Sequence, residues 1–271
     1  MKTFFNLLII SILVLTQNAF GQRKRTPSQS NDKGDIKVVW NKVQNQDYAE
    51  FQEDLKKEHF MEDMAEYLNE TFSMPEDLFI TCDECGEENA FYDPEAKKII
   101  ICYEMIDYLY EILEKKYKGD KLDEVVWNAT TFILFHELGH ALIDIYDLPM
   151  TGKEEDTVDN FSAYFLTTTG DDADTQAVLD GAWAFRTMSE ESEKDQEIKD
   201  LPLWGVHSLD SQRFYNIACM VYGSAGDSKK YRYLVKKGYL PADRADGCID
   251  EYDKVARSWD KLLEPWVKPQ N

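Results

Sequence analysis

The chain has 271 residues and a formal net charge of −22 at pH 7, from 52 acidic and 30 basic residues. This length allows one domain with a substantial core, or two small domains. The acidic balance argues against nucleic acid as a partner, because binding to phosphates requires a basic surface. We expect the acidic residues to be spread over the surface, where they favour solubility.

The N-terminus has the features of a secretory signal peptide. Lys2 precedes an apolar run over residues 4–15, which is too short to cross a bilayer comfortably. We therefore expect a signal peptide over residues 1–21, cleaved after Gly21, with an uncleaved anchor as the alternative. Residues 22–35 are polar and basic, which predicts a flexible leader. The mature protein would be secreted or periplasmic, and no later segment is apolar enough to span a membrane.

The pattern of apolar residues over 36–271 predicts a mainly helical α+β domain. Strands are expected at 36–40 and 78–80, and a hairpin at 90–92 and 99–102 around a turn at Asp93-Pro94. Helices are expected at 48–71, 103–117 and about 123–146, and the chain beyond residue 170 is also helical. This organisation suggests an N-terminal lobe at about 36–148 with a small sheet, and a helical C-terminal lobe at about 149–271.

The most informative motif is His136-Glu137-Leu138-Gly139-His140. Positions four apart on a helix lie on the same face, so the two histidines can bind one Zn²⁺ from the same side. Glu137 would then lie beside the metal, where it could take a proton from water. The flanking residues are apolar almost all round, which predicts a buried helix. The alternative is a pair of core histidines bonded to backbone carbonyls, but it leaves Glu137 unexplained.

A catalytic zinc site needs a third protein ligand, and the sequence offers acidic residues after the first helix. Pro149 and Gly152 end that helix, and a second helix is expected to begin at Thr151 or Lys153. Glu155 and Asp159 would lie one turn apart on its first turns. We expect Glu155 to ligate the metal and Asp159 to accept the free N–H of a ligating imidazole. A solvated acidic first turn is the alternative.

These residues carry a family resemblance. The pentapeptide followed by Glu155 and Asp159 resembles the gluzincin pattern HExxH…ExxxD, in which the glutamate is the third ligand and the aspartate its partner. Longer matching segments are GEENAFYDP from Gly86, ICYE from Ile101, HELGHALIDIYDLPMTGKEED from His136 and HSLDSQRFYN from His207. Over most of residues 75–265 the chain resembles bacterial metallopeptidases known as domain of unknown function 4344. The resemblance implies a zincin-like fold, zinc as cofactor and a peptide or protein substrate.

The resemblance also suggests a strand that binds substrate. In gluzincins a strand at the edge of the sheet pairs with extended substrate through backbone hydrogen bonds. The segment Asn89-Ala90-Phe91 resembles that strand. An ordinary structural hairpin is an equally good interpretation.

In gluzincins a histidine or tyrosine from the C-terminal lobe steadies the oxyanion of the tetrahedral intermediate. His207 is the candidate for this role, because it is the one histidine after the metal motif. Tyr215 and Arg213 are nearby candidates for supporting it. A lone histidine at the start of a helix is often structural, and Ser208 or Asp210 can cap that helix.

Five cysteines in an exported chain suggest disulfides. Cys219 and Cys248 form a plausible long-range pair. Cys102 can pair with Cys85 or Cys82, and we favour Cys85 because it immediately precedes Gly86 and the strand-like segment that begins at Asn89. This choice leaves Cys82 single. Structural zinc at Cys82-x-x-Cys85 is disfavoured, since no second motif of that kind accompanies it.

Together these features predict an exported zinc metallopeptidase. Glu137 would accept a proton as water attacks the carbonyl, and pass it to the leaving amine. One alternative is a zinc amidase acting on a non-peptide substrate, since HExxH fixes chemistry more firmly than substrate. The other is a non-catalytic exported binding protein with a zincin fold, although such a scaffold has no need of Glu137.

Overall fold

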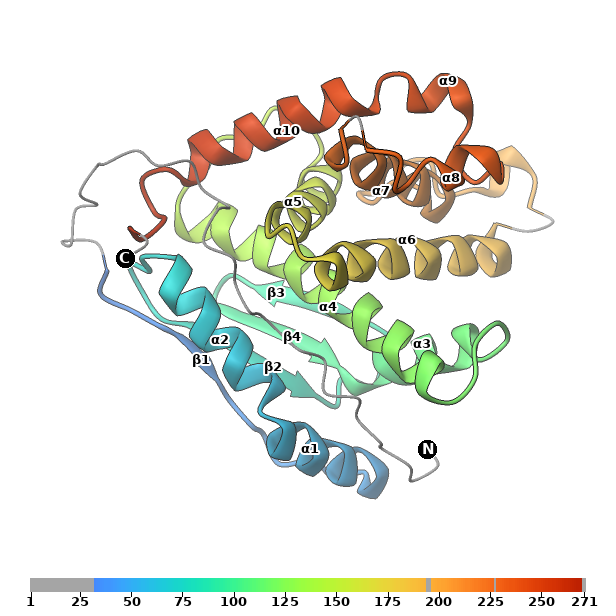
Figure 1. The fold of residues 1–271 in the computed structure, drawn as a ribbon. Helices are drawn as coiled ribbons and strands as arrows, with labels where there is room; N and C mark the ends of the chain where they lie inside the picture. Colours follow the sequence, from blue (N-terminus) through green and yellow to red (C-terminus); the bar gives the residue numbers. More distant parts are fainter. Residues whose placement is uncertain (1–31, 194–195, 227, 270–271) are drawn as a thin grey trace. The chain divides into compact units, whose positions relative to one another are not determined.

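The computed structural model describes residues 32–193, 196–226 and 228–269 (Figure 1). The predicted signal peptide and residues 22–31 of the predicted leader lie outside these ranges. The chain forms two compact units. The first comprises the described residues up to Tyr108 with His140–Leu148 and the C-terminal residues from Leu262, and the second comprises Leu109–Gly139 and Pro149–Lys261.

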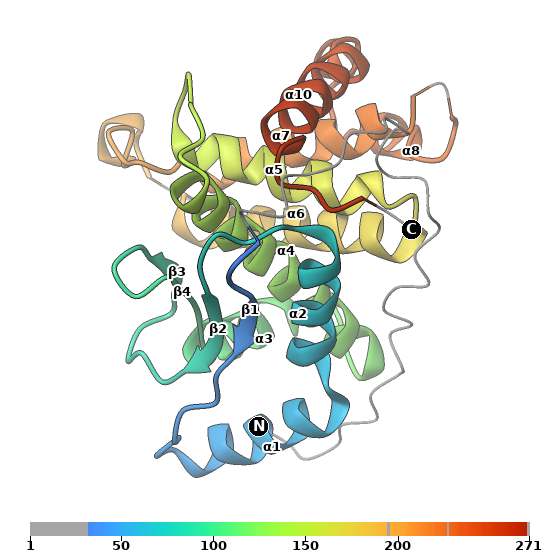
Figure 2. The same ribbon diagram turned by 90° about the vertical axis from the view of Figure 1, so that its left-hand side faces the viewer.

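The first unit contains a four-stranded mixed sheet with the order β1-β2-β4-β3 (Figures 1 and 2). Its strands are β1 (Ile36–Val38), β2 (Leu78–Asp83), β3 (Ala90–Asp93) and β4 (Lys98–Cys102). The β1–β2 and β2–β4 pairs are parallel, whereas β3 and β4 form the predicted antiparallel hairpin. Strand β3 therefore lies at an edge of the sheet. Lys33 and Gly34, within the range expected for the leader, donate backbone hydrogen bonds to the carbonyl of Met74.

The prediction of one helix over 48–71 was wrong, because the chain breaks at His59. Helix α1 (Gln46–Glu58) ends there and helix α2 (Phe60–Thr71) begins. His59 has a left-handed φ of 56° and its backbone N–H bonds to the carbonyl of Lys56, as at a helix C-terminus. Helix α2 lies beside β1 (Figure 2), and the side-chain amide of Asn69 bonds to both the N–H and the C=O of Ile36.

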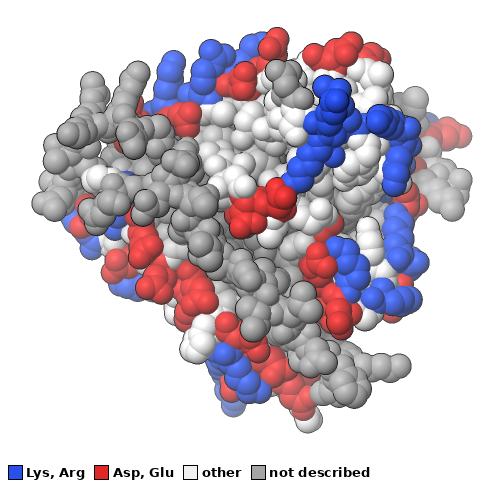
Figure 3. All heavy atoms as spheres, viewed as in Figure 1, with Lys and Arg blue, Asp and Glu red and all other residues white. Residues whose placement is uncertain are grey.

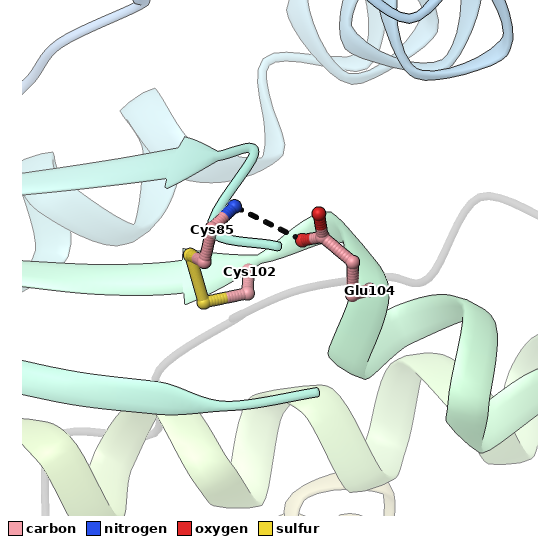
Figure 4. Close-up of side chains that lie close together, drawn as sticks. All are labelled: Cys85, Cys102 and Glu104. Atoms are coloured by element: carbon pink, nitrogen blue, oxygen red, sulfur yellow. Dashed lines mark hydrogen bonds between the residues drawn. A yellow bond between two sulfur atoms is a disulfide. The ribbon is translucent and has the colours of Figure 1, made fainter. Parts of the chain in front are cut away.

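Both predicted disulfides are present, Cys85–Cys102 and Cys219–Cys248. The first closes the end of β4 onto the connection between β2 and β3 (Figure 4). The carboxylate of Glu104, in helix α3 (Tyr103–Leu113), accepts the N–H of Cys85 at 3.1 Å and of Gly86 at 2.9 Å. Cys82 is free and fully buried, and burial raises the pKa of its thiol to about 12. It is therefore unreactive at neutral pH.

The last residues of helix α4 (Asp120–Ile145) belong to the first unit. Asp144 accepts hydrogen bonds from Tyr92 Oη and Lys97 Nζ, both at 2.6 Å. These contacts attach the β3–β4 hairpin to the end of α4.

The second unit is helical. Besides most of α4 it contains α5 (Glu154–Thr168), α6 (Asp172–Ser192), a 3₁₀ turn η2 (Ile198–Asp200), α7 (Asp210–Ser224), α8 (Tyr233–Lys236), α9 (Ala242–Ala245) and α10 (Cys248–Leu263). Helices α5, α6 and α7 pack on one another. A sheet with a helical C-terminal region confirms the predicted α+β class. No helix in the described ranges is both long and apolar enough to cross a membrane.

Gly139 sets the distance between α4 and α5. A Cβ atom placed there would lie 2.8 Å from the side chain of Val158 and 3.1 Å from that of Phe161. Real Cβ atoms essentially never come within 3.0 Å of another atom, so the distance to Val158 shows that glycine permits the two helices to touch at this point. A second contact joins the same helices one turn along α5 and two turns back along α4, where Ser162 Oγ donates to the carbonyl of Phe132 at 2.9 Å.

Candidate metal centre

Helix α4 carries His136 and His140 one turn apart, as the motif predicts. His136 and Glu137 are buried, with relative exposures of 4% and 6%. Polar side chains buried this deeply need partners. Their burial follows from the apolar flanks, since Phe135 and Leu138 are buried on the same helix.

Helix α5 brings the predicted third ligand to the two histidines. It begins at Glu154, just after its N-cap residue Lys153, so Glu155 lies in the first turn. Ligand atoms of His136, His140 and Glu155 all lie within 4.8 Å of one another. His136 Nε2 lies 3.2 Å from Glu155 Oε2. The three side chains thus converge on a volume that one metal ion could occupy.

Asp159 lies one turn after Glu155 and contacts the far side of the His136 ring. Its Oδ1 is 2.7 Å from His136 Nδ1. An ionised carboxylate can only accept, so Nδ1 carries a hydrogen, and Nε2 is the nitrogen that can bind a metal once it has lost its own proton. Nε2 faces Glu155, which is the arrangement that ligation requires.

Arg213, from α7, binds the same carboxylate side-on. Its Nε donates to Asp159 Oδ2 and its Nη2 to Oδ1, both at 2.8 Å. The Phe185 ring lies over the guanidinium, with its centroid 3.7 Å from the guanidinium carbon. Burial alone would raise the pKa of Asp159, but the charge and hydrogen bonds of Arg213, followed by those of His136, lower it well below its usual range.

The sequence suggested Arg213 as a support for the oxyanion, whereas the structure commits its guanidinium to Asp159. A basic residue 54 positions from an aspartate gives no sequence signal for such a pair. Only the packing of α5 against α7 brings them together.

The surroundings of His136 favour its protonated form when no cation is bound. Burial lowers the pKa of His136, but hydrogen bonds to Asp159 and Glu155 outweigh burial and raise it to about 9. Metal binding must displace this proton, because an imidazolium has no lone pair to donate.

His207 also lies at this group. Its Nε2 is 2.8 Å from Glu155 Oε2, and its ring centroid is 6.3 Å from that of His136. The His207 side chain is 53% exposed, so solvent or a substrate can reach it. The expected cap at Ser208 or Asp210 was wrong: the N-cap of α7 is Leu209, whose backbone N–H donates to Gln212 Oε1.

Tyr215 follows Arg213 by two positions on α7. Two positions correspond to about 200° around a helix, so the two side chains leave it on nearly opposite sides. Because Arg213 faces Asp159, Tyr215 is directed away from that carboxylate, and its ring packs against Phe214 with centroids 5.2 Å apart.

The predicted substrate strand lies in the first unit. Ala90 and Phe91 belong to β3, the edge strand, and Asn89 directly precedes it. The backbone carbonyl of Asn89 accepts the N–H of Cys102 at 3.1 Å, which extends the hairpin by one residue. An edge strand has unpaired backbone groups, as substrate pairing would require. Pairing itself stays a prediction.

Comparison with curated proteins found no significant match, and comparison with solved structures found none either. A family model described as "Putative metallopeptidase" matches residues 40–263. This range contains the two histidines, Glu137, Glu155, Asp159, His207 and Arg213. The chain therefore belongs to the family of domain of unknown function 4344.

Proposed function

We propose that this protein is an exported zinc-dependent metallopeptidase that hydrolyses peptide bonds. The observation that carries the proposal is the convergence of His136, His140 and Glu155, whose ligand atoms lie within 4.8 Å of one another. The hydrogen bond from His136 Nδ1 to Asp159 adds to it, since ligating histidines in metal sites are normally held in this way.

The donor set fits zinc. Two imidazole nitrogens and one carboxylate oxygen are the ligands of a well-known class of catalytic zinc site. His136 Nε2 and Glu155 Oε2 are 3.2 Å apart. Two ligand atoms that each lie about 2.0 Å from a tetrahedral Zn²⁺ are about 3.3 Å apart. Bound Zn²⁺ would supply a Lewis acid that polarises a carbonyl and lowers the pKa of a water molecule to about 7.

Glu137 would act as the general base. It adjoins His136 on α4 and is buried, and in the HExxH motif the glutamate at this position serves a metal-bound water as general base. It would take a proton from the attacking water and deliver it to the nitrogen of the leaving amine. His207 would donate a hydrogen bond to the oxyanion that develops on the carbonyl. Arg213 and Asp159 would hold His136 in one orientation and one tautomer.

Export is supported by the two disulfides, which form and persist in oxidising compartments. The N-terminal sequence of the protein recovered from the periplasm or the medium should begin at Gln22. Protein that retains residues 1–21 would instead indicate an anchor.

The proposal is tested by the Glu137→Gln variant, which keeps the size of the side chain and removes its basicity. Elemental analysis should find one zinc per chain in both proteins, with His136→Ala as the metal-free control. Peptide hydrolysis by the variant should fall by about 10²-fold or more. Full activity in Glu137→Gln would exclude the mechanism. A zinc-loaded wild-type protein that cleaves no peptide in a diverse panel, but does cleave a non-peptide amide, would favour the amidase alternative.

A further inference from the structure

The second unit exposes a cluster of apolar side chains beside the metal centre. Among the described residues, the large apolar side chains that are exposed are Met150 at 38%, Leu203 at 58%, Trp204 at 79% and Val206 at 69%. Single exposed apolar residues are common on protein surfaces. Three within four consecutive positions are not, and such patches usually mark a binding surface.

The exposed side chains of Leu203 and Trp204 lie in a hydrogen-bonded turn, and Val206 follows it. The N–H of Gly205 donates to the carbonyl of Pro202 at 2.9 Å, which closes a β-turn with Leu203 and Trp204 at its central positions. Lys153 Nζ, at the start of α5, donates to the carbonyl of Gly205 at 3.3 Å. The backbone of the turn is thus tied to the same helix end that carries Glu155.

The turn leads directly into the site. Val206 adjoins His207, whose Nε2 is 2.8 Å from Glu155 Oε2. Trp204 precedes His207 by three positions, so their Cα atoms are at most about 11 Å apart. An extended peptide covers this distance in about three or four residues. A substrate bound at His207 could therefore place a neighbouring side chain on the turn.

The charge of the surrounding residues distinguishes between two possible binding partners of this turn, a membrane and a peptide. Membrane-binding turns are flanked by Lys or Arg, which bind anionic lipid headgroups. Residues 196–212 contain one Lys and three acidic residues, and the whole chain carries a charge of −22. Acidic and basic side chains are also interspersed over the face drawn in Figure 3. The excess of acidic residues in the segment around the turn disfavours an anionic membrane and favours a neutral or basic peptide.

We propose that the turn Pro202–Gly205, together with Val206, is a specificity element that packs against a bulky apolar side chain of the peptide substrate, close to the bond that is cleaved. Trp204 provides most of the contact, because an indole offers the largest apolar surface with few rotatable bonds. This inference rests on the proposed function for the site, and it names the class of substrate: uncharged or basic peptides with a large apolar residue.

The test measures binding, so that it does not depend on turnover. The probes are blocked octapeptides of Ala and Ser with one Lys, each with a single Phe at a different position, and the parent peptide without Phe. Their dissociation constants are measured by calorimetry with the zinc-loaded Glu137→Gln protein. The measurements are repeated in that background with Trp204→Ala, and with Trp204→Phe as the conservative control.

At least one Phe peptide should bind about tenfold more tightly than the parent. Trp204→Ala should reduce this preference to within about twofold, while Trp204→Phe should retain most of it. The melting temperatures of the variants should match that of their parent protein, because Trp204 is largely exposed. An unchanged preference in Trp204→Ala, or no preference for Phe at any position, would overturn the proposal.

Two other outcomes would also overturn it by identifying a different occupant. One is Trp204-dependent binding to phosphatidylcholine vesicles, with or without phosphatidylserine, while a Phe residue in the peptides does not change their binding. The other is concentration-dependent dimerisation that Trp204→Ala abolishes. The two proposals can fail separately. Peptide binding that depends on Trp204 without any hydrolysis would contradict the proposed peptidase activity alone. Hydrolysis without a preference that depends on Trp204 would contradict the proposed specificity element alone.

Discussion

Arg213 donates two hydrogen bonds to Asp159, from Nε to Oδ2 and from Nη2 to Oδ1, each at 2.8 Å. Arg213 therefore acts on His136 through Asp159: the arginine holds the carboxylate in place, and the carboxylate orients the ring of His136. Both side chains of the pair are nearly inaccessible, with exposures of 11% and 6%. A pair in such surroundings is costly to break, because the remaining charge loses its partner while it stays buried.

We expect Arg213→Met to weaken zinc binding by about 10–100-fold, as for other residues that orient metal ligands. It should also lower the free energy of unfolding by about 3 kcal/mol, since it leaves the buried carboxylate of Asp159 without its arginine and with the hydrogen bond to His136 as its remaining support. Competition with a chelator and chemical denaturation measure the two effects. The double variant Arg213→Met with Asp159→Asn should recover part of the stability. Zinc affinity unchanged in Arg213→Met would show that Asp159 orients His136 without help.

Gly139→Ala tests the contact between α4 and α5. In an isolated helix this change would stabilise by about 1 kcal/mol. Here the added methyl would lie 2.8 Å from Val158, so we expect a net loss of about 1–3 kcal/mol and a lower melting temperature.

Zinc affinity should fall with it, because a displaced α5 carries Glu155 away from the histidines. In the Val158→Ala background, which makes room for the methyl, Gly139→Ala should reduce the free energy of unfolding much less. A higher melting temperature for Gly139→Ala alone would contradict the close approach of the helices.

His207→Ala separates two roles for the exposed imidazole. If His207 stabilises the oxyanion, kcat should fall by about 10²-fold or more while zinc affinity stays unchanged. If instead it only holds Glu155, through the 2.8 Å contact with Oε2, zinc affinity should fall and kcat of the zinc-loaded enzyme should not. We expect the first result. Tyr215→Phe is the matched control and should leave both quantities unchanged, because that side chain leaves α7 on the opposite side from Arg213.

The stability contributed by Asp144 should depend on pH. Burial raises the pKa of Asp144, but the hydrogen bonds from Lys97 and Tyr92 outweigh burial and lower it below its usual value. A lowered carboxyl pKa stabilises the folded state above the unfolded pKa of about 3.9, and the contribution is lost as the pH falls through the folded pKa.

Asp144→Asn should therefore destabilise the protein at pH 7, by less than about 1 kcal/mol because the side chain is partly exposed. The difference from wild type should shrink as the pH falls below about 4. Thermal unfolding across this range checks the expectation, with the exposed neighbour change Asp147→Asn as the control. A difference that does not vary with pH would mean that the Asp144 contacts do not depend on its charge.

The local geometry of the candidate site follows from the order of the amino acids. The α-helical period places His136 and His140 on one face and Glu155 and Asp159 on another, whatever the rest of the chain does. Two short runs of strand-forming residues around the turn at Asp93-Pro94 likewise predicted the β3–β4 hairpin. These relations span four positions or a single turn, so backbone periodicity is enough to derive them.

The relations between distant segments come from the packing of the folded chain. The pair Arg213–Asp159, the contact of Gly139 with Val158 and the meeting of His207 with Glu155 each join different parts of the chain. The break at His59 also escaped prediction, because the apolar spacing continues through it while the backbone turns left-handed. Helical spacing determines which residues share a face of a helix. It does not determine which faces of different helices contact one another, because that depends on side-chain packing over the whole unit.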